Sequence, residues 1–244
     1  MPGFLCFSLW SPLAAFGDVA VGERRLSLER PGRSAVLGLV AAALGIERRD
    51  QPALDALAAS LLVAVRSFAA GTLLEDYHTA QVPPARRGVR HATRRDELAA
   101  STLGTILSRR DYRQEPWHEV VLVQGGSTSV ELVAVEAALR LPRLVLYHGR
   151  KACPLGLPPD PRLVDAADLS AALDRYGRDS KARELLCRQS RPGALYADFA
   201  LADRLGRAWR VDRIVERRDE PGDRRRWQFS MRGELVAVPS EGVA

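Results

Sequence analysis

Cysteine and histidine are scarce in this chain, and their positions exclude several classes of site. The three cysteines, Cys6, Cys153 and Cys187, are odd in number, lie far apart and form no C-x-x-C pair. This spacing argues against a disulfide framework and a zinc site, and it favours a reducing compartment, with the cytoplasm as the default. The four histidines fall at no metal-ligand spacing, so we expect neither a metal site nor a bound cofactor.

The sequence also lacks an apolar run long enough to span a bilayer. The run at 34–46 is too short and contains two glycines. Residues 1–17 are apolar, but no Lys or Arg precedes the run and Pro12 interrupts it, so we expect a first strand rather than a signal peptide. No membrane association is predicted.

Lysine is nearly absent, because only Lys151 and Lys181 are found among 36 basic side chains. The positive charge is therefore carried by planar guanidinium groups, which are suited to bidentate contacts with phosphate. A biased genome base composition would produce the same excess of arginine.

The chain has 244 residues, of which 46% are hydrophobic, so it can bury a full hydrophobic core. We expect a larger domain at 1–150 and a smaller C-terminal β-containing region at 151–244. The predicted elements of the first domain are strands at 3–10, 61–68, 117–123 and 143–147 and helices at 35–44, 52–59 and 129–139, with Ser34 as the N-cap of the first helix. Without the short second helix the order is βαββαβ, which predicts an α+β fold of the ferredoxin-like (RRM-like) type.

An arginine-rich arm, about residues 80–115, is predicted between the second and third strands of that domain. From 85 to 113 it holds eight arginines and three acids, which gives +5 of the net charge of +6 of the whole chain. Clustered arginines that neutralise phosphates supply most sequence-independent affinity for nucleic acid, whereas a solvated charged loop is the alternative. A short helix is expected at 96–107. The arginines concerned are Arg86, Arg87, Arg90, Arg94, Arg95, Arg109, Arg110 and Arg113.

Two further basic elements accompany the arm. His148-Gly149-Arg150-Lys151 follows the predicted fourth strand, and glycine there would allow a nucleotide backbone to approach two cations. Arg33-Ser34 begins a helix, where free N–H groups and the helix dipole favour an anion. Since the strands lack the paired aromatic residues of an RRM, we expect RNA recognition through loops and backbone. Gly125–Ser129 lacks the ending of a P-loop and is interpreted as a capped turn.

Several separated motifs resemble those of the CasD-type subunits of type I-E CRISPR Cascade complexes, members of the repeat-associated RNA-binding superfamily. They occur in the order of that family over most of the chain. The motifs are RSAVLGL at 33–39, DYHT at 76–79, HGRKACPL at 148–155, RDEP at 218–221 and RWQF at 226–229. Residues 113–116 depart from the family pattern after Arg110-Asp111-Tyr112.

The resemblance implies a non-catalytic subunit that caps the 5′ handle of the CRISPR RNA (crRNA). Its arm would fold over the guide beside a backbone subunit, its body would dock the large PAM-reading subunit, and it would meet target DNA through the assembled complex. The residues that we carry over as handle contacts are Arg33, Ser34, Tyr77, His78, Arg110, Arg150 and Lys151.

Two other functions remain open from the residues alone. One is a metal-independent endoribonuclease that processes CRISPR precursor RNA, since His78, Tyr77, Tyr112 and Lys151 are residue types suited to acid–base catalysis. The other is a DNA-binding regulator, which the absence of a helix-turn-helix signature disfavours.

Overall fold

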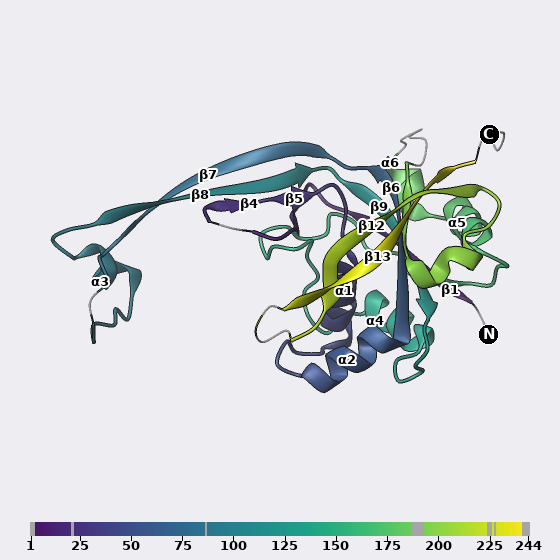
Figure 1. Ribbon diagram of the computed structural model, residues 1–244, viewed down its shortest axis with the longest axis horizontal. Helices are drawn as coiled ribbons and strands as arrows, with labels where there is room; N and C mark the ends of the chain where they lie inside the picture. The colour runs from purple at the N-terminus through teal and green to yellow at the C-terminus, as the bar shows by residue number, and fades with distance from the viewer. Residues whose placement is uncertain are drawn as a thin grey trace.

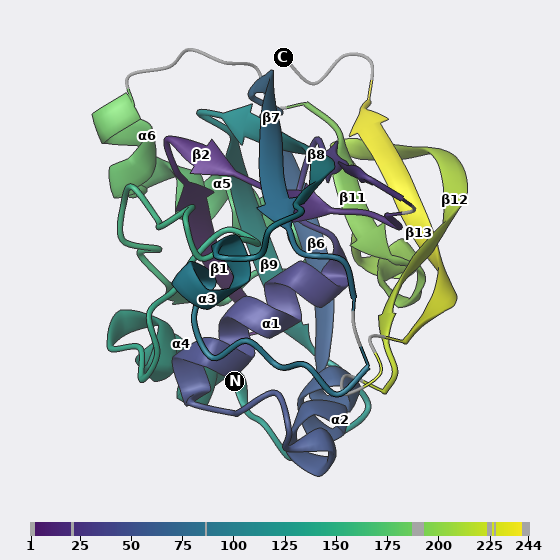
Figure 2. The same cartoon turned by 90° about the vertical axis from the view of Figure 1, so that its left-hand side faces the viewer.

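The protein consists of a body, built on one large sheet, from which a long arm extends (Figures 1 and 2). The computed structural model describes residues 3–20, 22–85, 87–186, 193–223, 226 and 228–240. The strands are β1 (Phe4–Trp10), β2 (Leu13–Ala14), β3 (Phe16–Gly17), β4 (Arg24–Arg25), β5 (Ser27–Leu28), β6 (Leu61–Ala69), β7 (Thr72–Val82), β8 (Gly104–Gln114), β9 (Trp117–Gln124), β10 (Arg162–Val164), β11 (Leu195–Asp198), β12 (Trp209–Pro221) and β13 (Phe229–Pro239). The helices are α1 (Arg33–Leu44), α2 (Gln51–Ser60), α3 (Arg94–Leu98), α4 (Leu132–Arg140), α5 (Leu169–Arg178), α6 (Lys181–Leu186) and the 3₁₀ helix η1 (Phe199–Arg204).

The large sheet has seven strands in the order β10-β1-β9-β6-β11-β13-β12, and every pair is antiparallel. The predicted α+β class is therefore confirmed. The elements β1, α1, β6, β9, α4 and β10 occur in the order βαββαβ when the short strands β2–β5, the helix α2 and the arm elements β7, α3 and β8 are left aside. Assignment to the ferredoxin-like type stays a prediction.

The central strands of the sheet are buried on both faces, which explains why β1 is an almost continuous apolar run. Leu5, Phe7 and Leu9 point to a core that also contains side chains of α1 and α4. Phe4 and Cys6 point to the opposite core, which contains side chains of α5 and η1. Burial also raises the pKa of the Cys6 thiol, so this cysteine is an inert core residue.

Helix α1 begins two residues earlier than predicted and is not capped by Ser34. Gly32 is the N-cap and has no side chain to accept a hydrogen bond. The cap comes from the far end of the chain, because the Arg33 backbone N–H donates to Oδ2 of Asp219 at 2.7 Å. The predicted anion at this helix N-terminus is thus a carboxylate of the protein itself.

The strand predicted at 143–147 does not form. The N–H groups of Arg143 and Leu144 donate to the carbonyls of Ala43 and Ala42, at 3.0 and 3.2 Å. These carbonyls belong to the last turn of α1, where four carbonyls lack partners within the helix. The strand beside β1 is instead β10, which is only three residues long.

The arm is an insertion between β6 and β9, as predicted, but it is longer and contains more strand. It runs over residues 72–114, as β7 paired antiparallel with β8 and α3 near the tip (Figure 1). The helix predicted at 96–107 is α3, at Arg94–Leu98, with Thr93 and Asp96 forming a capping box. Residues 104–107 belong to β8 instead.

Residues after position 150 complete the same sheet. β10 pairs with β1, and β11 pairs with β6, while β12 and β13 form a hairpin whose turn follows Pro221. A division into two domains at residue 150 stays a prediction. None of the helices in the described part of the chain is long and apolar enough to cross a membrane.

Candidate nucleic-acid interface

A cleft of about 1380 Å³ opens where the arm joins the body. Its walls come from the base of β8, the β3–β5 segment, α1, the loop at 145–150 and the β12–β13 hairpin. Six arginines and three aspartates are among its lining residues, so the cleft is net positive. The arginines are Arg25, Arg30, Arg110, Arg150, Arg217 and Arg218, and the acids are Asp18, Asp219 and Asp223.

One face of the arm is turned toward this cleft. Ser108 and Arg110 of β8 line it, and their partners across the β7–β8 ladder are His78 and Asp76. Directly opposed residues in a ladder point to the same side, so His78 shares the cleft face. Its imidazole binds the Asp76 carboxylate. The structure thus places Arg110 and His78 on the same face of the arm.

Tyr77 and Arg109 lie on the other face of the arm. They are cross-strand partners, and the Arg109 guanidinium carbon is 5.8 Å from the centroid of the Tyr77 ring. Arg109 also pairs with Glu75 at 3.6 Å. Because successive residues of a strand alternate in direction, Tyr77 and His78 do not face one ligand from one side.

Arg150 lines the cleft, but part of its bonding capacity is used by the protein. It donates to the carbonyls of Asp111 and Arg25 at 3.1 and 3.2 Å, and its guanidinium carbon is 4.4 Å from the centroid of the Tyr112 ring. These contacts fasten the loop at 145–150 to the arm. The neighbouring Lys151 is exposed.

Gly149 lines the cleft, and its backbone lies very close to another segment of the protein. Its φ is +79°, and a Cβ at this position would lie 1.8 Å from the carbonyl oxygen of Ala15. The close neighbour that requires glycine is therefore the β2–β3 connection of the protein itself.

Four other arginines of the predicted arm lie near its tip, away from the cleft, whereas Arg113 lies at its base opposite Leu73. Arg87, Arg90, Arg94 and Arg95 are exposed, and Arg94 pairs with Glu97 at 2.5 Å. Arg86 lies outside the described residues. Ser34 lines the cleft and is half-buried.

The position of Arg33 contradicts the prediction that it contacts RNA. Its side chain is only 6% exposed, and all three guanidinium nitrogens donate to protein groups. The acceptors are Glu220 at 2.8 Å, Asp198 at 2.7 Å, the Leu61 carbonyl at 2.9 Å and the Ala58 carbonyl at 2.8 Å. A buried guanidinium with these partners cannot also bind phosphate, so Arg33 has a structural role.

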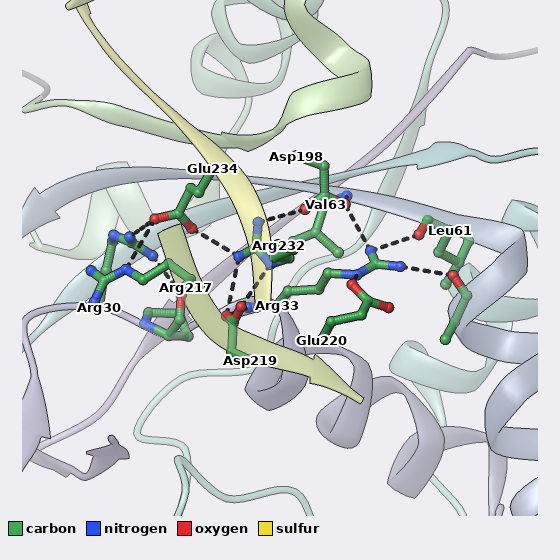
Figure 3. Close-up of polar contacts among 12 residues, drawn as sticks. Arg30, Arg33, Leu61, Val63, Asp198, Arg217, Asp219, Glu220, Arg232 and Glu234 are labelled. Carbon is green, nitrogen blue, oxygen red and sulfur yellow. Dashed lines mark hydrogen bonds and ion pairs between the residues drawn. The ribbon is translucent and has the colours of Figure 1, made fainter. Parts of the chain in front are cut away.

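Arg33 belongs to a network of four arginines and four carboxylates beside the cleft (Figure 3). Arg232 is at its centre and binds Asp198, Asp219 and Glu234 at 3.0, 2.6 and 2.9 Å. Burial acts to lower the pKa of Arg232, but these carboxylates outweigh it and raise the pKa. Burial raises the pKa of Asp198, while Arg33 and Arg232 oppose that shift. The other members are Arg30, Arg217 and Glu220.

Two buried histidines next to the cleft are uncharged at neutral pH. Burial lowers the pKa of His148 to about 4 and that of His118 to about 3, with His148 and Arg30 adding to the shift of His118. His148 shares a hydrogen bond of 2.7 Å with Ser11 Oγ. Within the described ranges, no three His, Cys, Asp or Glu side chains are grouped so as to hold a metal ion.

Sequence reasoning missed three exposed or half-exposed arginines of the cleft, Arg25, Arg217 and Arg218. Each belongs to a basic pair, Arg24-Arg25 or Arg217-Arg218, which was a usable signal. The loop at 125–129 is a turn, since the N–H groups of Gly125 and Ser127 donate to the carbonyls of Ser60 and Ala59. The predicted cap is wrong, because the N-cap of α4 is Glu131, which makes no side-chain capping hydrogen bond.

Comparison with known proteins agrees with the motifs. Residues 4–233 match the family described as CRISPR-associated protein (Cas_Cas5). The chain is 30% identical over 184 residues to the CRISPR system Cascade subunit CasD of Escherichia coli (strain K12), covering 72% of this chain and 78% of the relative. A chain of a CRISPR RNA-guided surveillance complex superposes with a TM-score of 0.58 at 25% identity, covering 98% and 91% of the two chains. A crystal structure of a Cas protein has the same fold, with a TM-score of 0.54 and 22% sequence identity. The superposition covers 98% of this chain and 96% of the other.

Proposed function

Because the chain belongs to the CRISPR-associated protein (Cas_Cas5) family, we propose that it is a Cascade subunit that binds and caps the 5′ handle of the crRNA. The observation that carries this proposal is the net positive cleft at the base of the arm, where Arg25, Arg110 and Arg218 are exposed. Proteins that bind single-stranded nucleic acid commonly use a positively charged groove that follows the sugar–phosphate backbone. The partners are the crRNA, a backbone subunit and the large PAM-reading subunit, with target DNA met through the assembled complex.

The arrangement supports an extended path for the RNA. The cleft face of the arm carries Arg110 and His78, and the arginines near the tip continue the positive charge outward. The strand order of the body, with α1 and α4 on one face, supports the ferredoxin-like assignment that is common among RNA-binding domains.

RNA that copurifies with the tagged protein, expressed with its CRISPR array and partner subunits, is expected to share one 5′ segment followed by variable guides. A cleft that recognises the handle selects the common segment and tolerates any guide. Sequencing the bound RNA from its 5′ end measures this. Recovery of bulk cellular mRNA without a common 5′ segment would contradict the proposal.

We propose that the subunit is not catalytic. One observation favours the endoribonuclease alternative, which is the exposed His78–Asp76 pair on the cleft face of the arm. Two of the other acid–base candidates do not converge on it. Tyr77 lies on the other face of the arm, and Tyr112 lies four residues further along the ladder, about 14 Å away at 3.4 Å per residue, where its ring contacts Arg150.

Labelled repeat RNA incubated with the purified protein in a chelating buffer is therefore expected to remain intact. The measurement is a denaturing gel that compares the wild-type protein with His78→Ala. Cleavage at the 5′ side of the handle by the wild-type protein, lost in His78→Ala, would make the endoribonuclease the better assignment. Retained RNA integrity with weaker binding by His78→Ala would instead indicate a role in holding the arm.

A further inference from the structure

The β12–β13 hairpin forms one wall of the cleft, and its attachment to the body is unusual. The ladder between β12 and β13 has a register shift between Arg217 and Glu220. Residues 218 and 219 therefore leave the regular pairing, and such bulges redirect side chains. Arg218 is exposed to the cleft, whereas Asp219 turns to the N-terminus of α1.

The carboxylate of Asp219 accepts hydrogen bonds from two arginines, Arg33 and Arg232. Oδ2 accepts from the Arg33 N–H at 2.7 Å and from Nη2 of Arg232 at 3.1 Å, and Oδ1 accepts from Nε of Arg232 at 2.6 Å. In Figure 3 the Asp219 side chain lies between these two arginines, which come from α1 and β13. The next residue, Glu220, binds the Arg33 side chain at 2.8 Å.

Glycine at position 32 makes this approach possible. A Cβ on residue 32 would lie 2.4 Å from Oδ2 of Asp219, well inside van der Waals contact. The backbone itself does not require glycine, because φ is −80° and ψ is 172°, an extended conformation open to any residue. The only obstacle to alanine is thus the carboxylate from the hairpin.

We infer that the contact between Asp219 and the Gly32–Arg33 end of α1 is a positioning lock, which sets the hairpin wall and with it Arg218 against the RNA-binding cleft. This inference rests on the proposed function. Arg218 directly precedes Asp219 in the chain, and its side chain has no hydrogen bond or ion pair with any other described residue, so its placement depends on the backbone that Asp219 anchors. Asp219 and Gly32 act through Arg218 and do not touch RNA.

The lock is tested with Gly32→Ala, Asp219→Ala and the double variant, measured on the full chain with labelled repeat RNA at several salt concentrations. Each single variant is expected to weaken RNA binding about threefold to tenfold and to flatten the slope of log K against log salt by roughly 0.7, the value for one phosphate contact to a single strand. The double variant is expected to match Asp219→Ala, because without the carboxylate the added methyl group meets nothing.

Gly126→Ala is the matched control, since a Cβ there has no atom within 4 Å and the residue lies away from the cleft. Asp219→Asn, which keeps an acceptor for the Arg33 N–H, is a milder variant that serves if Asp219→Ala does not fold. A lower melting temperature with unchanged affinity and salt slope would overturn the lock, as would additive losses in the double variant. If the wild-type protein itself shows no salt-dependent binding of the RNA, the proposed function fails instead.

Discussion

Replacing Arg33 with alanine is expected to lower the free energy of unfolding by about 3–5 kcal/mol, the usual cost of breaking a buried ion pair from one side. The substitution leaves Asp198 without one of its two arginines and removes the donors from the carbonyls of Ala58 and Leu61. Chemical denaturation of the purified protein measures the loss.

The control is Arg94→Ala on the arm, where an exposed arginine pairs with Glu97. We expect a change of less than about 1 kcal/mol there, because exposed ion pairs contribute little. Should Arg33→Ala fold with normal stability and lose only RNA affinity, Arg33 would be the RNA contact that the sequence pattern suggested, and the structural assignment would be wrong.

The combined substitution Arg110→Ala and Arg218→Ala is expected to weaken binding of repeat RNA by about 10- to 100-fold, since each removes a charged donor to phosphate. The slope of log K against log salt is expected to fall by roughly 1.4, which corresponds to two phosphate contacts on a single strand. Stability should change little, because both side chains are exposed and neither forms an ion pair with another described residue.

The matched control for this experiment is Arg178→Ala with Arg210→Ala, which removes the same charge from exposed positions that do not line the cleft. Equal losses in the two double variants would mean that net charge alone attracts the RNA, and the cleft would lose its assigned role. A variant of the exposed arm arginines Arg87, Arg90 and Arg95 then separates the contribution of the tip from that of the cleft.

Local sequence pattern was sufficient for the central elements of the fold. β1, α1, β6 and β9 lie within one or two residues of their predicted limits, because each has a strong apolar pattern matched to burial on the sheet. The arm was also visible, since a long charged segment between two apolar strands cannot enter the core. Its strands were underestimated because β7 and β8 are largely exposed and lack the apolar alternation that marks a half-buried strand.

The roles of individual arginines were decided only by tertiary structure. Arg33 and Arg110 have the same guanidinium chemistry, yet Arg33 is enclosed by carboxylates 165 and 187 residues further along the chain, whereas Arg110 faces an open cleft. Sequence spacing carries no information about which distant acids reach a given side chain. The same limit explains the missing strand at 143–147, where the N–H groups of Arg143 and Leu144 bind carbonyls in the last turn of α1, and the three-residue β10 that lies beside β1 in its place. Sequence by itself determined where charge and apolar residues gather, and long-range contacts determined which charges remain available to a ligand.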